Sequence, residues 1–396
     1  MPASKVMIAP QAVKRVRNFD AWVFRDELDV RQPAIASGDS VEVVDSHGRF
    51  VAWAFYSAVS HIALRITSLE QSQPFNTALL SRRLARAIAA RAGLAGTNAK
   101  RLVFSEADEL PGLIVDQYAG HLVVQLRSAG MDRWRSLLVE LLQEQLQPAG
   151  ILERSDKEFR EEEGLEPVTQ VLAGAVPDRL LIEEDDLKFW IDPYRGLKTG
   201  FYLDQRTTRR RLRQLIQPKA RVLDAFSYTG SCAIAAAKAG ASVVCVEQDE
   251  AFIELAKENA ALNNVSDRIE YVAGDAFYWL KAKAEHGAQY AWVMLDPPAL
   301  VKSKTGLTKG RQALHHLVTH GLALLAPHGE CLLHVCTYHL VGLVEEIVRI
   351  AASSQGLRLQ VREQWLQAED HPWMLQVPAS RYLASWRFGR DGQSAA

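Results

Sequence analysis

The stretch Val222-Leu223-Asp224-Ala225-Phe226-Ser227-Tyr228-Thr229-Gly230-Ser231 decides the fold of the last part of this chain. Its first residues predict a buried strand, which runs into a tight loop of small residues and then into an alanine-rich helix over residues 231–239. Gly240 ends that helix, and a second strand over residues 242–247 finishes on Glu247. A strand, a loop, a helix and a strand that ends in an acid are typical of a nucleotide-binding βαβ unit, with the acid placed for a ribose diol.

The loop between the first strand and the helix favours one kind of cofactor. It holds a single glycine, Gly230, and does not match the G-x-G-x-x-G pattern that accompanies a bound pyrophosphate. S-adenosylmethionine has a sulfonium centre where a dinucleotide has phosphates, so it needs no such pattern. The loop therefore predicts a methyltransferase-like site.

The composition bounds the class of protein. With 396 residues the chain is longer than one typical domain, so two or three domains are expected. A formal net charge of -1 gives no overall attraction to nucleic acid, so any basic surface must be local. The cysteines form no C-x-x-C pair and no zinc-type spacing, which favours a reducing cytoplasm and no metal site. No run of residues is long enough to span a membrane, and the N-terminus has no apolar targeting segment.

The first 185 residues divide into two zones. Short alternating segments separated by turns predict a small β-rich module, with strands over residues 40–45, 50–56 and 61–66. A connector over residues 71–76 then leads into a compact α+β domain. Its helices are expected over residues 77–92 and 133–146, its strands over residues 101–104, 112–116, 121–126 and 150–152, and an acidic loop over residues 158–163. We place the three domains at residues 1–72, 73–185 and 186–396.

From residue 186 onward strands and helices alternate. Strands are expected over residues 221–224, 242–247, 268–273, 290–295 and 330–335, and helices over residues 231–239, 250–263, 276–285 and 308–325. This order is typical of a doubly wound parallel sheet, an α/β fold. Because ligands bind beyond the carboxyl ends of the strands in such a sheet, each strand end is a candidate part of the site. These ends carry Asp224, Glu247, Asp275, Asp296 and Cys336.

Three of these acids also have a purely structural interpretation. Glu247 either accepts from the ribose diol of the cofactor or is a solvated acid beside a helix start. Asp275 either contacts the adenine or caps the helix that begins at Ala276. Asp224 either touches the ligand or orients the loop that follows it.

Asp296-Pro297-Pro298 is a more specific signal. Two prolines at a strand end fix the backbone and leave a stiff edge lined by carbonyl groups, which suits a flat base. In base N-methyltransferases an aromatic residue that stacks on the base usually follows a similar motif, whereas Ala299 follows here. The motif is either a plain rigid turn or, as we predict, the edge of a nucleobase site, and it argues against methylation of an exocyclic amine.

Cys336 indicates the chemistry. Carbon 5 of a pyrimidine is a poor nucleophile until a group adds covalently at carbon 6, and a thiolate does this well near neutral pH. Cys331 and Cys336 are five residues apart on one predicted strand, so their side chains point to opposite faces. Cys336 at the strand end is the candidate nucleophile, and Cys232, Cys245 and Cys331 are interpreted as buried packing cysteines.

Upstream of the βαβ unit lies Gly196-Leu-Lys-Thr-Gly-Phe-Tyr-Leu-Asp-Gln-Arg206, which suits a loop that closes over a ligand. The arginine-rich run over residues 209–213 follows it. That run is either a solvated helix face or, beside a nucleobase site, a set of phosphate contacts.

Together these residues resemble a known family. The chain is similar to the bacterial ribosomal RNA large-subunit methyltransferases that make 5-methylcytosine, and the similarity runs in collinear order over nearly the whole chain. The stretches that carry it are residues 106–116 (Glu-Ala-Asp-Glu-Leu-Pro-Gly-Leu-Ile-Val-Asp), 153–156 (Glu-Arg-Ser-Asp), 163–165 (Glu-Gly-Leu), 196–206, 224–230, Asp296-Pro297-Pro298 and Cys336.

The resemblance implies an N-terminal PUA domain that contacts RNA, a small central α+β domain and a Rossmann-like class I methyltransferase domain. It also implies that Phe226, Gly230, Glu247, Asp275 and Asp296 line the S-adenosylmethionine site and that Cys336 attacks a cytosine. This chain departs from the family in two places. Val335-Cys336-Thr337 stands where the family usually has Ser-Cys-Ser, and Asp20-Ala21 precedes Trp22 where the family usually has His-Pro. Neither departure removes the nucleophile.

We therefore predict methylation of carbon 5 of a cytosine in 23S ribosomal RNA, with Cys336 and Asp296 as catalytic residues. The predicted cofactor residues are Phe201, Gln205, Asp224, Phe226, Ser227, Gly230, Glu247, Asp275, Ala276 and Asp296. The predicted RNA-binding residues are Lys14, Arg15, Arg17, Arg206, Arg209, Arg210, Lys302 and Lys304. The prediction includes a cytoplasmic location, no membrane partner and no metal, and it leaves a homodimer open.

Three other functions remain open. A uracil-5 methyltransferase would share the thiol chemistry, but that family usually has Arg after Asp-Pro-Pro and Asn-Pro after its cysteine, and both are missing here. Guanine-N7 methylation occurs in a related domain that lacks the cysteine. A non-catalytic RNA-binding assembly factor would keep the fold and the cofactor site without methyl transfer.

Overall fold

The computed structural model of the chain describes residues 3–29, 35–301 and 306–391, which fall into two compact units. The first unit comprises Met1–Asp185, Ile191–Leu203 and Glu369–Ser380, and the second comprises Asp186–Trp190, Asp204–Ala368 and Arg381–Ala396. Two segments that lie beyond residue 185 therefore belong to the first unit. The predicted domain boundaries stay predictions.

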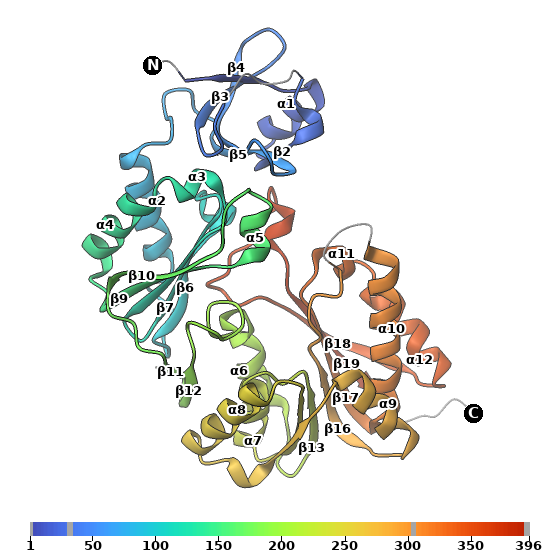
Figure 1. Cartoon of the computed structure of the whole chain (residues 1–396). Coiled ribbons are helices and arrows are strands. Elements are labelled where there is room, and N and C mark those ends of the chain that lie inside the picture. The colour runs from blue at the N-terminus through green and yellow to red at the C-terminus, as the bar shows by residue number, and fades with distance from the viewer. Residues whose placement is uncertain (1–2, 30–34, 302–305, 392–396) are drawn as a thin grey trace. The chain divides into compact units, whose positions relative to one another are not determined.

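The N-terminal part of the first unit is a five-stranded sheet with one helix (Figure 1). Its strands are β1 (Lys5–Met7), β3 (Ser40–Val44), β4 (Phe50–Tyr56), β5 (Ile62–Ser68) and β2 (Trp22–Phe24), in that spatial order. The three strands predicted from alternation, β3, β4 and β5, are confirmed. Helix α1 (Pro10–Arg17) buries Val13 and Val16 in the core of this module and turns its basic residues outward.

The central part of the first unit is a second sheet in the order β10-β9-β8-β7-β6, packed against helices α2 and α4 (Figure 1). Its elements are α2 (Thr77–Ala90), β6 (Ala99–Phe104), β7 (Leu113–Tyr118), β8 (His121–Leu126), α3 (Ala129–Asp132), α4 (Arg135–Leu146), β9 (Gly150–Ser155), α5 (Lys157–Glu161), β10 (Val168–Gly174) and β11 (Leu180–Glu184). Asn76 begins α2 as an N-cap, since its side chain accepts from the amide of Leu79 at 2.9 Å.

One prediction for this part is wrong. The acidic residues 158–163 were expected in a loop, but they begin in the short helix α5. Tertiary contacts hold this helix, because the buried side chain of Arg160 donates to the carboxylate of Asp132 at 2.5 Å and to the carbonyl of Glu166 at 2.6 Å. The acidic residues alone carried no signal for these contacts.

A buried ion network joins the two sheets of the first unit. Arg65 on β5 donates to Glu106 at 2.9 Å and to Glu163 at 2.9 Å, and the indole of Trp22 donates to the same oxygen of Glu106 at 2.9 Å. Burial alone would raise the pKa of Glu106, but the charge of Arg65 and hydrogen bonds from Ser105 and Trp22 hold it below its usual value. Glu106 and Glu163, both in stretches that carry the family resemblance, thus have structural roles.

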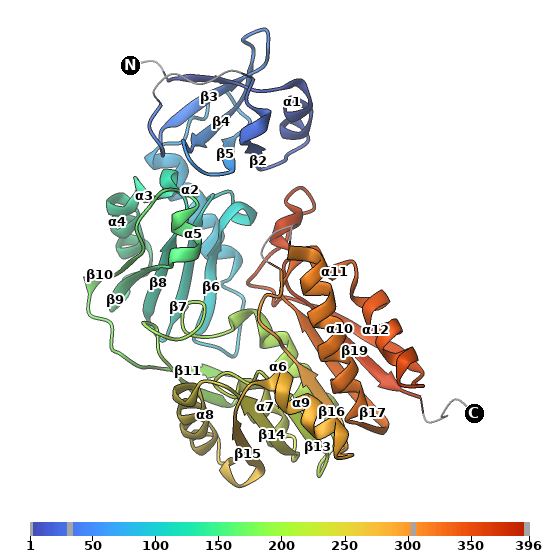
Figure 2. The ribbon, with the colours of Figure 1, turned by 45° about the vertical axis from the view of Figure 1, so that its right-hand side comes forward.

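The second unit is a seven-stranded sheet in the order β15-β14-β13-β16-β17-β19-β18 (Figure 2). Its strands are β13 (Arg221–Ala225), β14 (Ser242–Glu247), β15 (Ile269–Ala273), β16 (Tyr290–Leu295), β17 (Leu325–Val335), β18 (Leu359–Leu366) and β19 (Ala384–Arg390). Its helices are α6 (Arg206–Leu215), α7 (Ser231–Lys238), α8 (Glu250–Leu262), α9 (Ala276–Glu285), α10 (Leu307–Ala323), α11 (Tyr338–Val341) and α12 (Val344–Ser354), and β12 (Leu187–Ile191) precedes them. The five predicted strands and four predicted helices are confirmed.

The sheet is mixed rather than wholly parallel. The first five strands of this sheet, β13 to β17, pair in parallel, whereas β19 runs antiparallel to both β17 and β18. Strand order reverses between β13 and β16, because the chain winds outward from β13 to β15 and then returns to the other side of β13. In an open α/β sheet this reversal marks the place where ligands bind.

The two faces of this sheet differ in chemistry. Alternate residues such as Leu223, Leu295 and Val335 pack with α9, α10 and α12 into the main apolar core. Residues between them, such as Asp224 and His334, point to the opposite face and are buried there. The functional side chains therefore lie on the face opposite the main apolar core.

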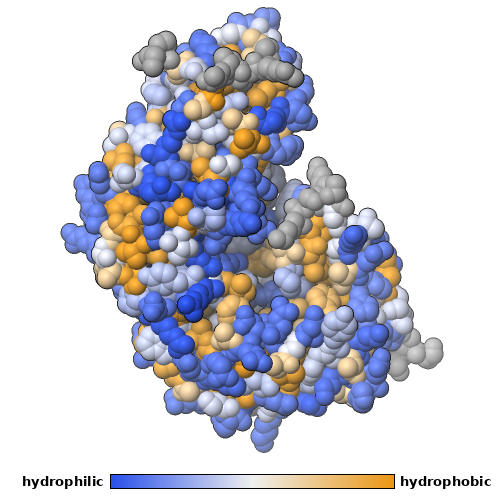
Figure 3. Space-filling model, viewed as in Figure 1, coloured by the Kyte–Doolittle hydropathy of each residue, from blue (hydrophilic) through white to orange (hydrophobic). Residues whose placement is uncertain are grey.

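On the side of the molecule in Figure 3, hydrophobic residues form scattered patches among hydrophilic ones. None of the helices in the described ranges is both long enough and apolar enough to cross a bilayer.

Candidate functional site

The carboxyl ends of five parallel strands meet at one edge of the sheet in the second unit. The register pairs Asp224 with Cys245 on β14 and with Met294 on β16, and it pairs Leu295 with Leu333 on β17. Asp296 and His334 follow those last two residues, so they are lateral neighbours at the edge. The structure thus brings together strand ends that are more than a hundred residues apart in sequence.

Backbone geometry shapes the loop after β13. Phe226 and Tyr228 have positive φ angles of 67° and 49°, which side-chain-bearing residues seldom adopt. The amides of Phe226 and Ser227 both donate to the carbonyl of Val246, at 3.0 and 3.2 Å. These bonds fold the loop back over the end of β14 and hold it in a conformation that costs on the order of 1 kcal/mol for each such residue.

Glu247 is fixed by backbone amides. One of its carboxylate oxygens accepts from the amide of Tyr228 at 2.8 Å, and the other accepts from the amides of Gln248 and Asp249 at 2.8 and 3.1 Å. A carboxylate oxygen has more than one acceptor site, so these bonds orient the group without using all of its capacity. The geometry fits the predicted ribose contact, which stays a prediction.

Gly230 is required by the loop for two reasons. Its φ angle is +74°, and a Cβ atom placed there would lie 3.1 Å from the Cβ of Ala256 on α8. It is also the residue at which α7 begins. Glycine is therefore needed here for the turn and for the close approach of α8. Neither reason involves a bound pyrophosphate.

Asp224 is a buried carboxylate whose bonding is incomplete. Its side chain is 3% exposed, and its Oδ2 has no hydrogen-bond partner among the described residues. Burial, together with the negative charges of Asp296 and Glu247, raises its pKa to about 8. A cationic ligand would relieve both the repulsion and the unsatisfied oxygen. S-adenosylmethionine carries a sulfonium and an ammonium group, so these residues fit it.

Asp275 serves a structural role in the structure. Its side chain caps α9 by accepting from the amides of Phe277 and Tyr278, at 2.7 and 3.3 Å, and it is exposed. Ala276 next to it is buried, and the ring of Phe277 packs edge-on against Phe226 at 5.3 Å. Because a capping oxygen can accept further bonds, the predicted adenine contact stays open.

Asp296 is held by Gln205 from the segment that precedes α6. The amide of Gln205 donates to Oδ2 of Asp296 at 2.6 Å, and the thiol of Cys232 donates to the other end of that amide at 3.5 Å. The prediction of Cys232 as a buried packing cysteine is wrong, because Cys232 is half-buried and lies in this site. Its place in the first turn of α7, directly after the loop, was the signal that could have revealed it.

Cys336 directly follows the end of β17. Its thiol is half-buried and lies 4.0 Å from the carbonyl oxygen of Pro297 in the Asp-Pro-Pro motif. Cys331 points to the opposite face as predicted and packs in the apolar core, where burial raises its pKa to about 12. Burial also raises the pKa of Cys245 well above its usual value. Thiolate formation is therefore disfavoured at both of these buried cysteines.

Sequence reasoning missed three residues of this region. His334 is buried on the same face as Asp296 and hydrogen-bonds Ser385 on β19 at 2.6 Å. Burial lowers the pKa of His334, against the opposing charges of Asp296 and Asp204. Tyr382 donates to Asp204 at 2.5 Å. His334 is two residues before Cys336, so strand alternation could have placed both side chains on one face. No sequence spacing relates Ser385 and Tyr382 to the site, because their segment enters it only through strand pairing.

The predicted RNA-binding residues have different environments. Lys14 and Arg17 are exposed on α1, whereas Arg15 is engaged by Asp20 at 2.7 Å and Glu27 at 2.6 Å. Arg206 and Arg209 are fully buried, which leaves neither guanidinium open to a phosphate, so this part of the prediction is corrected. Arg210 is partly exposed. Lys302 and Lys304 lie outside the described residues.

Phe201 is buried in the first unit, and its predicted cofactor contact stays a prediction.

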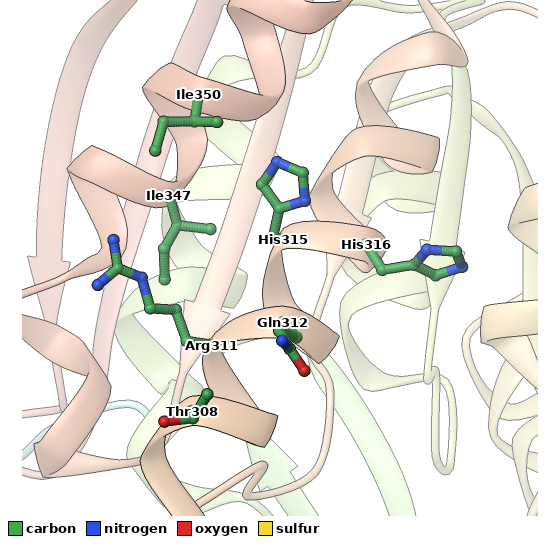
Figure 4. Close-up of a pocket in the computed structure, with 7 residues that line it drawn as sticks. All are labelled: Thr308, Arg311, Gln312, His315, His316, Ile347 and Ile350. Atoms are coloured by element: carbon green, nitrogen blue, oxygen red, sulfur yellow. The ribbon is translucent and has the colours of Figure 1, made fainter.

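A separate pocket of about 460 Å³ lies between α10 and α12 (Figure 4). Its lining residues are Thr308, Arg311, Gln312, His315, His316, Ile347 and Ile350. Arg311 forms an ion pair with Glu346 at 2.6 Å. None of the predicted site residues lines this pocket, and the two helices that form it pack on the apolar face of the sheet. It is therefore distinct from the site at the strand ends.

The strand order, the reversal point and the buried Asp224 before the glycine loop are those of an S-adenosylmethionine-dependent methyltransferase. Comparison with known families agrees, because the model of the S-adenosylmethionine-dependent methyltransferase family matches residues 157–362 and that of the PUA-like domain matches residues 6–69. The chain belongs to the family of ribosomal RNA large subunit methyltransferase I. It is 34% identical over 387 residues to that protein from Pseudoalteromonas atlantica, and the alignment covers 96% of this chain and 98% of the relative. It is 35% identical over 386 residues to that from Shewanella amazonensis, which covers 96% and 97%.

Solved structures share the fold. The crystal structure of SMU.776 complexed with SAH has a TM-score of 0.85 at 20% identity and covers 98% of this chain and 100% of that one. Trm5b from Pyrococcus abyssi has a TM-score of 0.52 at 16% identity, covering 70% of this chain and 74% of that one. The predictions of the family, of the Rossmann-like fold with a PUA-like domain, and of S-adenosylmethionine as cofactor are confirmed.

Proposed function

We propose that this protein methylates carbon 5 of a cytosine in the ribosomal RNA of the large subunit, through a covalent bond between Cys336 and carbon 6 of that base. The relatives with which it aligns over nearly its whole length are named as methyltransferases of this RNA. The observation that carries the proposed chemistry is the half-buried thiol of Cys336, 4.0 Å from the carbonyl oxygen of Pro297, the residue after Asp296.

The residues of the chain have distinct tasks in this reaction. S-adenosylmethionine, when bound, supplies an electrophilic methyl group. Asp224 and the loop that follows β13, residues 226–230, hold the cationic donor. The stiff Asp-Pro-Pro edge receives a base that is unpaired or extruded from its helix. The thiolate of Cys336 adds to carbon 6, which makes carbon 5 nucleophilic. After carbon 5 is methylated, a base removes its proton, the double bond between carbons 5 and 6 re-forms and the thiolate leaves.

RNA binding is proposed for exposed cations of the N-terminal module and of α6. Lys14 and Arg17 on α1 are exposed and can meet phosphates, and the partly exposed Arg210 on α6 is a further candidate. Arg17 lies 3.7 Å from Asp45, a weak ion pair on an exposed side chain that a phosphate can replace. A protein that modifies ribosomal RNA is expected in the cytoplasm, and the homodimer stays a prediction.

A trapping experiment tests the covalent step. RNA in which the target cytosine carries fluorine at carbon 5 cannot lose a proton there, so the bond to Cys336 should persist and shift the protein on a denaturing gel. The Cys336→Ala variant should form no adduct and transfer no methyl group while it retains cofactor binding. Cys331→Ala, on the apolar face of the same strand, is the matched control and should still form the adduct.

The outcomes separate the remaining alternatives. Methyl transfer by Cys336→Ala at the wild-type rate would exclude the covalent mechanism. If the methyl group maps to uracil carbon 5 or to guanine N7, the modified base is not cytosine and this part of the proposal is wrong. Cofactor binding with no methyl transfer to any large-subunit RNA, either protein-free or in assembling particles, would favour a non-catalytic assembly factor.

A further inference from the structure

One of the two carboxylate oxygens of Asp296 accepts a hydrogen bond within the protein. Oδ2 accepts the amide hydrogen of Gln205 at 2.6 Å, and no other described residue hydrogen-bonds the side chain. The second oxygen, Oδ1, is thus left with its acceptor capacity intact. Asp296 itself is partly exposed, so this oxygen is available to a ligand at the strand edge.

The position of Gln205 is determined by the residues around it. Its side chain is 4% exposed, and the thiol of Cys232 donates to its amide oxygen, which directs the amide nitrogen toward Asp296. A reversed amide would place its oxygen against a carboxylate oxygen and its nitrogen toward the thiol. The observed orientation therefore satisfies both neighbours.

The residue before Gln205 anchors it to the last two strands. The carbonyl of Asp204 accepts from the amide of Ala368 at 2.8 Å, and its carboxylate accepts from the hydroxyl of Tyr382 at 2.5 Å. Ala368 and Tyr382 flank the connection between β18 and β19, and all of these residues belong to the second unit. Gln205 thus has a fixed backbone as well as a buried side chain.

The difference between the two pyrimidines lies at carbon 4. Cytosine carries an amino group there, which donates hydrogen bonds, whereas uracil carries a carbonyl oxygen, which only accepts. A carboxylate oxygen that faces this position attracts the first and repels the second. A site that hydrogen-bonds a substrate group strongly rejects an analogue that leaves its polar atoms unpaired.

We propose that Gln205 is a positioning residue that sets the choice of base: by binding one oxygen of Asp296 it directs the other to the amino group of cytosine. This inference rests on the proposed function and assigns the residue that makes the site selective for cytosine over uracil. Asp204 and Tyr382 support the same arrangement. Without Gln205, the carboxylate of Asp296 can rotate among several orientations. Only one of them contacts the amino group.

The experiment compares two RNA fragments of the large subunit that differ only in cytosine or uridine at the mapped target. The ratio of their kcat/KM values measures selectivity. Gln205→Leu should lower that ratio about tenfold, the effect of roughly one hydrogen bond to a charged group. Tyr382→Phe should lower it in the same direction and by less. Gln217→Leu, an exposed glutamine in the same unit, is the control.

Each outcome bears on one claim. An unchanged ratio in Gln205→Leu, with cytosine still methylated at carbon 5, would overturn the role of Gln205 and leave the proposed function intact. A wild-type enzyme that methylates a different atom would overturn the proposed function itself. A variant in which both fragments lose activity equally would show a general structural effect and would also reject the assignment of specificity. Melting temperatures of the variants establish that each is folded.

Discussion

The thiol of Cys336 lies 4.0 Å from the carbonyl oxygen of Pro297, the first proline of the Asp-Pro-Pro motif. The two residues follow the ends of neighbouring strands, β17 and β16, so sheet pairing brings their segments together. A nucleophile beside a rigid carbonyl edge can approach the face of a base whose rim is held by that edge. This relationship couples the strand that carries the nucleophile to the strand that carries Asp296.

Cys336→Ser should keep the fold and lose the activity. A serine hydroxyl is close in size to the thiol but has almost no anionic form near neutral pH, so addition to carbon 6 should slow by at least about 10³-fold. Transfer of labelled methyl groups to large-subunit RNA measures the rate, and thermal unfolding checks the fold. A loss below tenfold would mean that Cys336 does not form the covalent bond.

Asp224→Asn should weaken cofactor binding. The substitution keeps the shape but removes the charge that a sulfonium or ammonium group would meet, which costs roughly 1.5–3 kcal/mol for a hydrogen bond to a charged group. Calorimetric titration with S-adenosylmethionine should show a Kd higher by about one to two orders of magnitude. An unchanged Kd would place the cationic groups of the cofactor away from this carboxylate.

The raised pKa of Asp224 also predicts a pH dependence of stability. An aspartate in the unfolded chain has its ordinary pKa of 3.8, whereas burial and the charges of Asp296 and Glu247 raise it to about 8 in the fold. Between these two pKa values the folded state therefore binds more protons than the unfolded chain does. The stability that comes from this proton binding is greatest below the lower pKa and declines as the pH rises toward the higher one. Thermal unfolding without cofactor should show a flatter pH profile from about 4 to 8 in Asp224→Asn than in the wild type.

Arg65→Met should destabilise the first unit. The substitution leaves Glu106 and Glu163 as buried charges without their cation, and breaking a buried ion pair from one side costs about 3–5 kcal/mol. Because the pKa of Glu106 is lowered in the fold, the stability it contributes is present above its unfolded pKa and declines as the pH falls through the folded one. Chemical denaturation at neutral pH measures the loss, with Arg86→Met, an exposed arginine of the same unit whose partner Glu109 is also exposed, as control.

Gly230→Ala should lower both stability and cofactor affinity. An alanine at φ +74° is strained, and its Cβ would lie 3.1 Å from that of Ala256, so a loss of roughly 1–2 kcal/mol is expected. Gly342→Ala is the control, since a Cβ there meets nothing within 4 Å and no positive φ is required. Equal effects of the two substitutions would contradict the argument from loop geometry.

Lys14→Gln and Arg17→Gln should weaken RNA binding through lost phosphate contacts. Each cation that neutralises a phosphate contributes about one unit to the slope of log affinity against log salt, so the double variant should reduce that slope by roughly two. Binding of large-subunit RNA at several salt concentrations gives the slope. Arg15→Gln, which removes an arginine already engaged by Asp20 and Glu27, should change it less.

Local signals in the chain accounted for most of the sheet and helices of the second unit. The predicted helix over residues 276–285 matches α9, because Asp275 caps its start and the apolar period continues through it. The strand–loop–helix stretch around Gly230 indicated the cofactor half of the site, since backbone conformation and side-chain period are encoded over a few neighbouring residues. Cys336 was likewise proposed as the nucleophile from its place at a strand end, and that role stays a prediction.

Tertiary structure alone decided what packs on each face of those strands. Alternation in a strand shows that Asp224 and Leu223 point to opposite faces, but it does not show which segments cover them. Only folding places Gln205 and Cys232 beside Asp296, adds β19 antiparallel at the edge of the parallel strands, and buries Arg206 and Arg209 in a helix that its sequence alone would expose. These contacts join residues far apart in the chain, and their energies depend on burial and charge in the assembled unit rather than on any local pattern.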